Sequence, residues 1–81
     1  MPIPLPDLGS PRVVFSLWYV RVGDRVTEGD RVAEVRIPGA TFDVAAPADG
    51  VLVERLALPN DALEVGSLLG TIEEEFDRIT G

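Results

Sequence analysis

Turn-forming residues interrupt this chain at such short intervals that no helix of ordinary length fits between them. Glycine and proline break helices, and Asn, Asp or Ser beside them favours tight turns. The pattern therefore predicts many short strands joined by turns. The interrupting segments are Gly9-Ser10-Pro11, Gly23-Asp24, Glu28-Gly29-Asp30, Pro38-Gly39, Pro47-Ala48-Asp49-Gly50, Pro59-Asn60-Asp61, Gly66 and Gly70.

Between these turns lie runs of strand length that are rich in Val, Ile, Leu and Ala. Runs of this size and composition are typical of strands packed on a common core. Their alternation of polar and apolar residues is imperfect, which fits strands that bend and change face in a small barrel. We therefore expect an all-β sandwich or barrel. Its predicted strands are residues 13–22, 31–37, 41–46, 51–58 and 68–72.

The two halves of the chain show a weak internal repeat. Asp24 corresponds to Asp61 and Gly29 to Gly66, each at an offset of 37 (61 − 24 and 66 − 29). Two units are too few for a solenoid, so the repeat predicts a barrel with quasi-two-fold symmetry. The apolar positions that keep the same offset are Val26 with Leu63, Val32 with Leu69 and Val35 with Ile72.

Missing residue types restrict the chemistry open to the chain. The 81 residues contain no His, Cys, Lys or Gln. Without His no side chain titrates near neutrality in its unperturbed state, and without Cys there is neither a thiolate nucleophile nor a soft metal ligand. The serines have no base to activate them. We therefore predict no catalytic residues, no metal site and no enzymatic activity.

The length of the chain limits the number of domains, and its net charge limits the classes of partner. The 81 residues suit one domain with one modest core, which we assign to residues 1–75, followed by a short tail at residues 76–81. A formal net charge of −7 repels phosphate backbones and anionic lipid, so we expect no nucleic acid and no membrane as partners. No apolar run has the length of a signal sequence or a membrane span, and we expect a cytoplasmic location.

Several segments follow one another in a known order and spacing from about Ile3 to Glu73. Together they resemble the lipoyl/biotinyl carrier domain family, and within it the lipoyl domain of 2-oxo acid dehydrogenase acyltransferases. The resemblance implies a flattened barrel (a barrel-sandwich hybrid) of two four-stranded antiparallel sheets with quasi-two-fold symmetry. The matching segments are Trp18-Tyr19-Val20-Arg21-Val22-Gly23-Asp24-Arg25-Val26, Glu28-Gly29-Asp30, Ala33-Glu34-Val35, Ala40-Thr41-Phe42-Asp43-Val44-Ala45-Ala46-Pro47, Asp49-Gly50-Val51, Asn60-Asp61-Ala62-Leu63-Glu64-Val65-Gly66 and Leu68-Leu69-Gly70-Thr71-Ile72.

In domains of that kind the cofactor arm is attached to a lysine in an Asp-Lys-Ala hairpin, and the resemblance places Pro38, Gly39 and Ala40 at the corresponding positions. Only the alanine is kept, and Gly39 occupies the slot of the modified lysine. Lipoyl and biotinyl groups are attached to a side-chain amine, and these 81 residues contain no lysine. We therefore predict no bound cofactor. The N-terminal amine is expected at the opposite end of the barrel from this hairpin.

Two interpretations of Pro38-Gly39 stay open. Pro and Gly suit the second and third positions of a type II turn, so the pair is explained by backbone geometry alone. Alternatively, Pro38, Gly39 and Ala40 are reshaped to contact a protein partner. Because two-residue hairpins prefer primed turns, we expect a slightly longer loop here. The four aspartates beside turn residues, Asp24, Asp30, Asp49 and Asp61, are interpreted as turn caps rather than a cation site.

Three hypotheses for function follow. The first is a protein-interaction or assembly module related to 2-oxo acid dehydrogenase complexes, with protein components of an acyltransferase or carboxylase complex as partners. The second is a structural scaffold or subunit without a carrier role, in which self-association is also open. The third is a lipoyl or biotinyl carrier domain whose lysine was lost or replaced.

Overall fold

A computed structural model describes residues 1–74 of the chain as eight β-strands, with no helix in that range. Proline stands close after two of the strand ends, with Pro38 directly after β4 and Pro47 two residues after β5, and no strand exceeds seven residues. The strands are β1 Pro2–Pro4, β2 Val13–Trp18, β3 Arg25–Val26, β4 Arg31–Ile37, β5 Ala40–Ala45, β6 Gly50–Arg55, β7 Ala62–Leu63 and β8 Leu68–Glu74.

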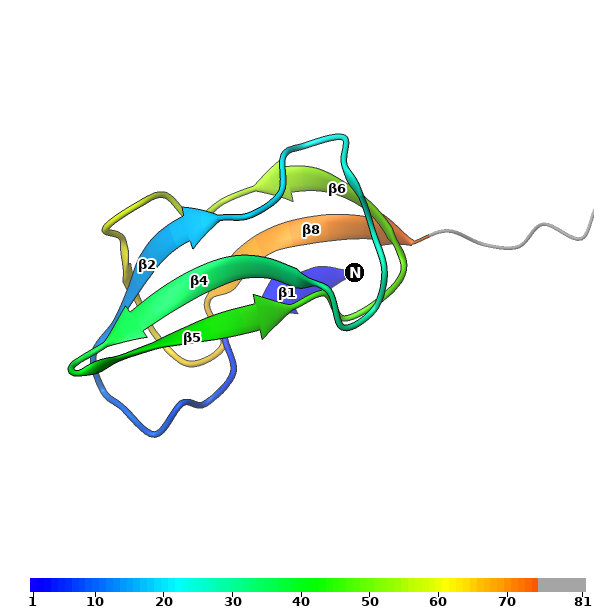
Figure 1. Ribbon diagram of the computed structural model, residues 1–81. Helices are drawn as coiled ribbons and strands as arrows, with labels where there is room; N and C mark the ends of the chain where they lie inside the picture. Colours follow the sequence, from blue (N-terminus) through cyan, green and yellow to red (C-terminus); the bar gives the residue numbers. More distant parts are fainter. Residues whose placement is uncertain (75–81) are drawn as a thin grey trace, which may run out of the picture.

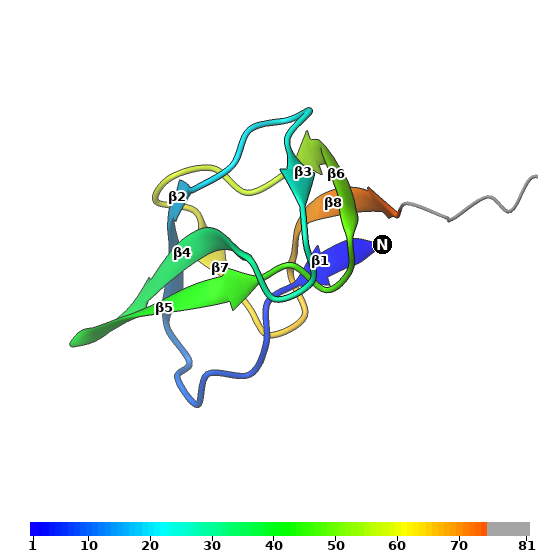
Figure 2. The same cartoon turned by 45° about the vertical axis from the view of Figure 1, so that its right-hand side comes forward.

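The eight strands form two four-stranded sheets with the orders β1-β8-β6-β3 and β5-β4-β2-β7. Every pairing is antiparallel. The sheets lie face to face as a flattened sandwich (Figure 1), and the short strands β3 and β7 are visible in the turned view (Figure 2). The predicted all-β architecture with two antiparallel sheets is confirmed.

A quasi-two-fold relation connects the halves more exactly than the sequence repeat suggested. Strands β2, β3 and β4 recur as β6, β7 and β8 with the same lengths, each shifted by 37 residues (50 − 13 for the first residues of β2 and β6). The burial pattern of β4 is reproduced position by position in β8. The two sheet orders also correspond strand by strand: β1, β8, β6 and β3 of the first sheet take the places of β5, β4, β2 and β7 in the second.

The turns obey the same relation. Gly23 has φ 97° and its equivalent Asn60 has φ 72°, so both halves place a left-handed residue at the same point. Asp24 accepts a hydrogen bond from the N–H of Arg21 at 2.8 Å, and Asp61 accepts one from the N–H of Leu58 at 2.9 Å. Matching side-chain caps thus hold matching turns, as predicted for these aspartates.

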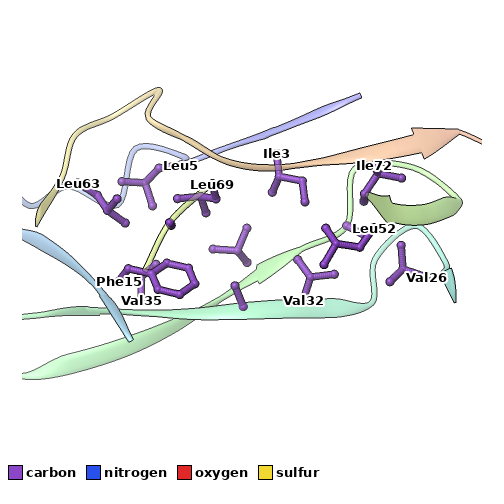
Figure 3. Packing of buried hydrophobic residues seen from close by; sticks show 14 of the residues in the cluster. Ile3, Leu5, Phe15, Val26, Val32, Val35, Leu52, Leu63, Leu69 and Ile72 are labelled. Atoms are coloured by element: carbon purple, nitrogen blue, oxygen red, sulfur yellow. The ribbon is translucent and has the colours of Figure 1, made fainter. Parts of the chain in front are cut away.

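The core lies between the two sheets and is built almost entirely from aliphatic side chains (Figure 3). Phe15 is the one aromatic residue fully inside it, and no polar or charged side chain within residues 1–74 is buried. Each buried Val, Leu or Ile contributes about 1.5–3 kcal/mol by leaving water. The buried residues are Ile3, Leu5, Val13, Phe15, Val26, Val32, Ala33, Val35, Val44, Ala46, Leu52, Ala57, Leu63, Leu69 and Ile72.

Two predicted strands were too long, and three short strands were not predicted. The run at residues 13–22 ends as a strand at Trp18, and the run at residues 51–58 ends at Arg55. After Trp18 and after Arg55 the chain leaves the sheet and enters the two capped turns described above. Strands β1, β3 and β7 have only two or three residues, too few to show a periodic pattern.

Imperfect alternation has the expected cause, because the ladders contain irregular registers. Register shifts occur between Phe15 and Leu17 in β2, between Arg31 and Ala33 in β4, and between Leu52 and Glu54 in β6. A bulge reverses which face the following residues occupy. The domain boundary predicted at residue 75 and the tail at residues 76–81 lie outside the described residues.

Candidate functional site

The hairpin between β4 and β5 carries the three residues singled out from the sequence. Ile37 pairs with Ala40, so the loop contains only Pro38 and Gly39. Gly39 has φ 81°, close to the value that the third position of a type II turn requires. The expectation of a slightly longer loop was wrong: proline fixes the first loop residue and glycine supplies the positive φ, so two residues suffice without a primed turn.

This tip is open and exposed. Pro38, Gly39 and Ala40 are all exposed, and they form one continuous apolar tip that projects from the sandwich (Figure 1). A Cβ added at Gly39 would meet no atom within 4 Å, so space does not exclude a side chain there. Only the positive φ disfavours one.

The base of the hairpin is held on both sides. Ile37 is partly buried and packs against the core cluster. On the outer side Arg36 donates from Nη2 to Oδ1 of Asn60 at 3.2 Å, which ties β4 to the capped turn before β7. Contacts of Ile37 and Arg36 therefore hold the base of the hairpin against the rest of the domain.

The N-terminal amine lies far from this tip. It donates a hydrogen bond to the carbonyl of Ile72 at 2.7 Å, near the end of β8. In Figure 1 this end of the molecule is opposite the β4–β5 tip, as predicted. The terminal amine is therefore not located at the hairpin where the resemblance places the attachment site.

A polar cluster on the outer face of β4 and β5 was not predicted. The Tyr19 hydroxyl donates to Asp43 at 2.9 Å and lies 3.5 Å from a Glu34 carboxylate oxygen. Arg31 lies over the Tyr19 ring, 5.8 Å from its centroid, and forms an ion pair with Asp43 at 3.4 Å. The hydrogen bond to Asp43 raises the pKa of Tyr19 above its ordinary value, and the two carboxylates act in the same direction. Sequence spacing could not show this, because the four residues come from three segments.

Trp18, the last residue of β2, and Tyr19, which follows the strand, differ in burial. Trp18 is partly buried, its ring centroid lies 5.2 Å from that of Phe15, and its Nε1 donates to the carbonyl of Ala57 at 2.9 Å. Tyr19 is 47% exposed. Beside Trp18 a shallow hollow of about 260 Å³ is lined by apolar residues, including Leu17 and Leu58, and contains one charged residue.

The described residues contain neither a cluster of metal-ligand side chains nor a helix suited to cross a membrane. No group of three Asp or Glu side chains within residues 1–74 is arranged to hold a metal ion. The turn aspartates instead bind backbone N–H groups, as when Asp49 accepts from Glu28 at 2.7 Å. In the same range no helix has the length and apolar character needed to cross a bilayer.

Comparison with known proteins assigns the chain to a family. A family model described as "Biotin-requiring enzyme", which covers biotin- and lipoyl-type domains, matches residues 1–72. This chain belongs to that family. The family likeness inferred from the sequence is thereby confirmed, and the chain is a lipoyl-type domain related to components of 2-oxo acid dehydrogenase complexes.

The individual relatives are larger proteins. The chain is 35% identical over 75 residues to the lipoamide acyltransferase component of a branched-chain alpha-keto acid dehydrogenase complex from Pseudomonas putida, covering 90% of this chain and 18% of that protein. It is 35% identical over 65 residues to the mitochondrial pyruvate dehydrogenase complex protein X component of Chaetomium thermophilum, covering 78% and 14%. The chain thus spans less than a fifth of either relative.

A solved structure shows the same fold. The solution structure of the lipoyl domain of the 2-oxoglutarate dehydrogenase complex from Azotobacter vinelandii superposes with a TM-score of 0.72 at 24% identity. The match covers 91% of this chain and 96% of that domain. The flattened sandwich with its β4–β5 hairpin is therefore the lipoyl-domain architecture.

Proposed function

We propose that this chain is a non-catalytic, lipoyl-type domain without a cofactor arm that acts as a protein-interaction or assembly module of a 2-oxo acid dehydrogenase-type complex. The observation that carries the proposal is the composition of the hairpin. The residues at its tip are Pro38 and Gly39, and no lysine occurs in the 81 residues. An amide-linked arm needs a side-chain amine, and arginine does not replace lysine as that nucleophile because its guanidinium stays protonated.

The retained fold supports an interaction role. A domain that keeps the sheets, the capped turns and a firmly based hairpin still presents a lipoyl-type surface to proteins that recognise such domains. The tip itself is apolar and exposed, and its base is fixed by Ile37 and Arg36. Protein components of an acyltransferase complex are therefore the partners we propose, with components of a carboxylase complex as the related alternative.

Binding to purified complex components tests this function. The immobilised domain is titrated with each purified component of a 2-oxo acid dehydrogenase complex from the same source, and the dissociation constants are measured. The test variant is Ala40→Arg, which places a charge on the tip without altering the turn residues. Its matched control is Val22→Arg, because Val22 is 54% exposed in the loop between β2 and β3.

The expected result is binding that Ala40→Arg weakens at least about tenfold, a loss of about 1.4 kcal/mol, while Val22→Arg leaves it unchanged. No binding to any component would favour the structural scaffold instead. Intact mass of the native protein provides the second readout, and it should equal the mass of the bare chain. A mass increase equal to one lipoyl or biotinyl group would refute the proposed loss of the arm.

A further inference from the structure

The two sheets each end in a strand related to the other by the quasi-two-fold, namely β1 and β5. Buried Ile3 in β1 and buried Leu5 just after it correspond to buried Val44 in β5 and buried Ala46 just after it, at an offset of 41 (44 − 3 and 46 − 5). A hollow of about 390 Å³ lies between Pro4 and Val44, and no backbone hydrogen bond joins the two strands within residues 1–74. Both are therefore edge strands.

The free edge of β1 is closed by proline. Met1 and Leu5 direct their backbone groups to β8, since Ile72 donates to the carbonyl of Met1 and Leu5 donates to that of Ser67. Backbone groups of alternate residues point to opposite sides of a strand, so positions 2, 4 and 6 face the free edge. All three are proline. Without an N–H, these positions offer no donor to another strand.

The equivalent edge of β5 is open. Ala46 donates to the carbonyl of Asp30, and Ala40 pairs with Ile37 across the turn, so even-numbered residues bond toward β4. The alternate residues therefore face the free edge. These are Thr41, Asp43 and Ala45, which are exposed and retain their N–H groups.

We propose that a second copy of this chain pairs with this open edge, strand β5 against strand β5, antiparallel about a two-fold axis at Phe42. In that register Thr41 faces Asp43 of the second copy, and both are residues whose backbone groups point outward, so a regular hydrogen-bonded pair forms. Phe42 faces Phe42 of the second copy at the non-bonded position. The four-stranded sheet that contains β5 in one copy then joins the same sheet of the second copy into one continuous sheet of eight strands.

Side chains are complementary in this register. Thr41 pairs with Arg36 within its own sheet, so Arg36, Thr41 and Asp43 of the second copy form one row on the same face. In the single chain the Arg36 side chain binds the neutral amide of Asn60, and it gains a carboxylate across the interface. The axis generates this pair twice, and no like charges face each other.

Phe42 supplies the apolar contact. It is 40% exposed, and aromatic residues facing each other at a non-bonded position stabilise antiparallel pairs. The contact area of one short strand is small and the net charge is −7, so the association is weak. We expect a dissociation constant on the order of 0.1–1 mM at about 0.15 M salt.

Sedimentation velocity and amide NMR spectra of the full 81-residue chain test the pairing, from about 20 µM to about 2 mM. The expected result is an increase in mean mass toward a dimer, with concentration-dependent amide shifts centred on Thr41, Asp43 and Ala45. Thr41→Pro removes one outward N–H and should abolish the mass increase. Thr41→Val keeps the N–H and should retain it.

Charge exchange gives an independent test should Thr41→Pro lower the folded population. Asp43→Arg should weaken association at least about tenfold, since it places two cations in one row, and adding Arg36→Asp should restore it. A chain that stays monomeric at about 2 mM overturns the proposal, even if a different protein is later found to bind at β5. Equal dimerisation of Thr41→Pro and Thr41→Val overturns it as well. These measurements use the chain alone, so a failure of self-association is distinguishable from a failure to bind dehydrogenase components.

Discussion

Replacing Gly39 tests whether the hairpin tip is held by backbone geometry. Gly39 has φ 81°, where an L side chain costs roughly 1–2 kcal/mol, and its Cβ direction is empty, so no steric clash adds to that cost. Pro38 is compatible with both type I and type II turns, so flipping the peptide between Pro38 and Gly39 relieves part of the strain. We therefore expect Gly39→Lys to destabilise the domain by about 1 kcal/mol.

Thermal unfolding followed by circular dichroism measures this change. For a domain of this size 1 kcal/mol corresponds to a fall in Tm of about 4–8 °C. Gly39→Ala is the matched control, because it introduces the same backbone strain without a charge and should lower Tm by a similar amount. An unchanged Tm in both variants would show that the turn does not depend on positive φ, and the type II assignment would be wrong.

The same lysine variant tests whether the hairpin differs from a lipoylated one only by loss of the lysine or also by a changed surface around the tip. Incubated with lipoate ligase, Gly39→Lys offers the only side-chain amine in the chain, and any increase in intact mass by one lipoyl group reports its recognition. Pro38→Asp together with Gly39→Lys restores the acid–lysine pair of the family pattern and should be modified to a greater extent. If neither variant gains mass, the surface around the tip no longer fits the ligase, and simple loss of the lysine is not the explanation.

Three further outcomes test the capped turns, the packing of β8 and the polar cluster. Asp24→Ala and Asp61→Ala each remove one equivalent turn cap, so each should lower the unfolding free energy by about 1 kcal/mol, and unequal losses in urea melts would contradict their structural equivalence. Gly70→Ala brings a Cβ within 2.5 Å of a backbone oxygen and 2.9 Å of the Trp18 ring, and should cost about 1–3 kcal/mol in the same melts. Phenolate absorbance should show Tyr19, the only tyrosine, titrating above its ordinary pKa of about 10, and Asp43→Asn should lower that midpoint. Because the folded pKa is raised, this stabilisation is complete below pH about 10 and is lost as pH rises through the folded pKa.

Sequence reasoning predicted the all-β class and the two related halves because its two strongest signals agreed, whereas the two four-stranded antiparallel sheets were implied by the family resemblance. Regular turn residues excluded helices, and the offset of 37 between Asp24 and Asp61 indicated two related halves. Both signals are local or repeated, so they can be seen without knowing any tertiary contact. The structure extends the same offset to whole strands and to the hydrogen bonds of the caps.

What the sequence left out depends on contacts between distant segments. The cluster around Tyr19 joins the residue that follows β2 to residues of β4 and β5, and nothing in the local sequence shows that they lie together. The hairpin loop was predicted too long because a general preference for primed turns was given more weight than the particular pair Pro38-Gly39. That pair supplies one fixed φ and one positive φ, which is enough to reverse the chain.

The contrast between the two edge strands follows from the same kind of reasoning. A fold with quasi-two-fold symmetry has two equivalent edge strands, here β1 and β5. Each of them needs its own protection if neither is to pair with a strand of another molecule. Here the first edge has proline at every outward position, whereas the equivalent positions 43 and 45 are aspartate and alanine. The symmetry of the fold and the asymmetry of its edges together direct strand pairing to β5. Because β5 begins at the hairpin tip, a change that blocks its edge also alters the surface that we propose for protein components, and the two roles must be separated by variants on either side of Thr41.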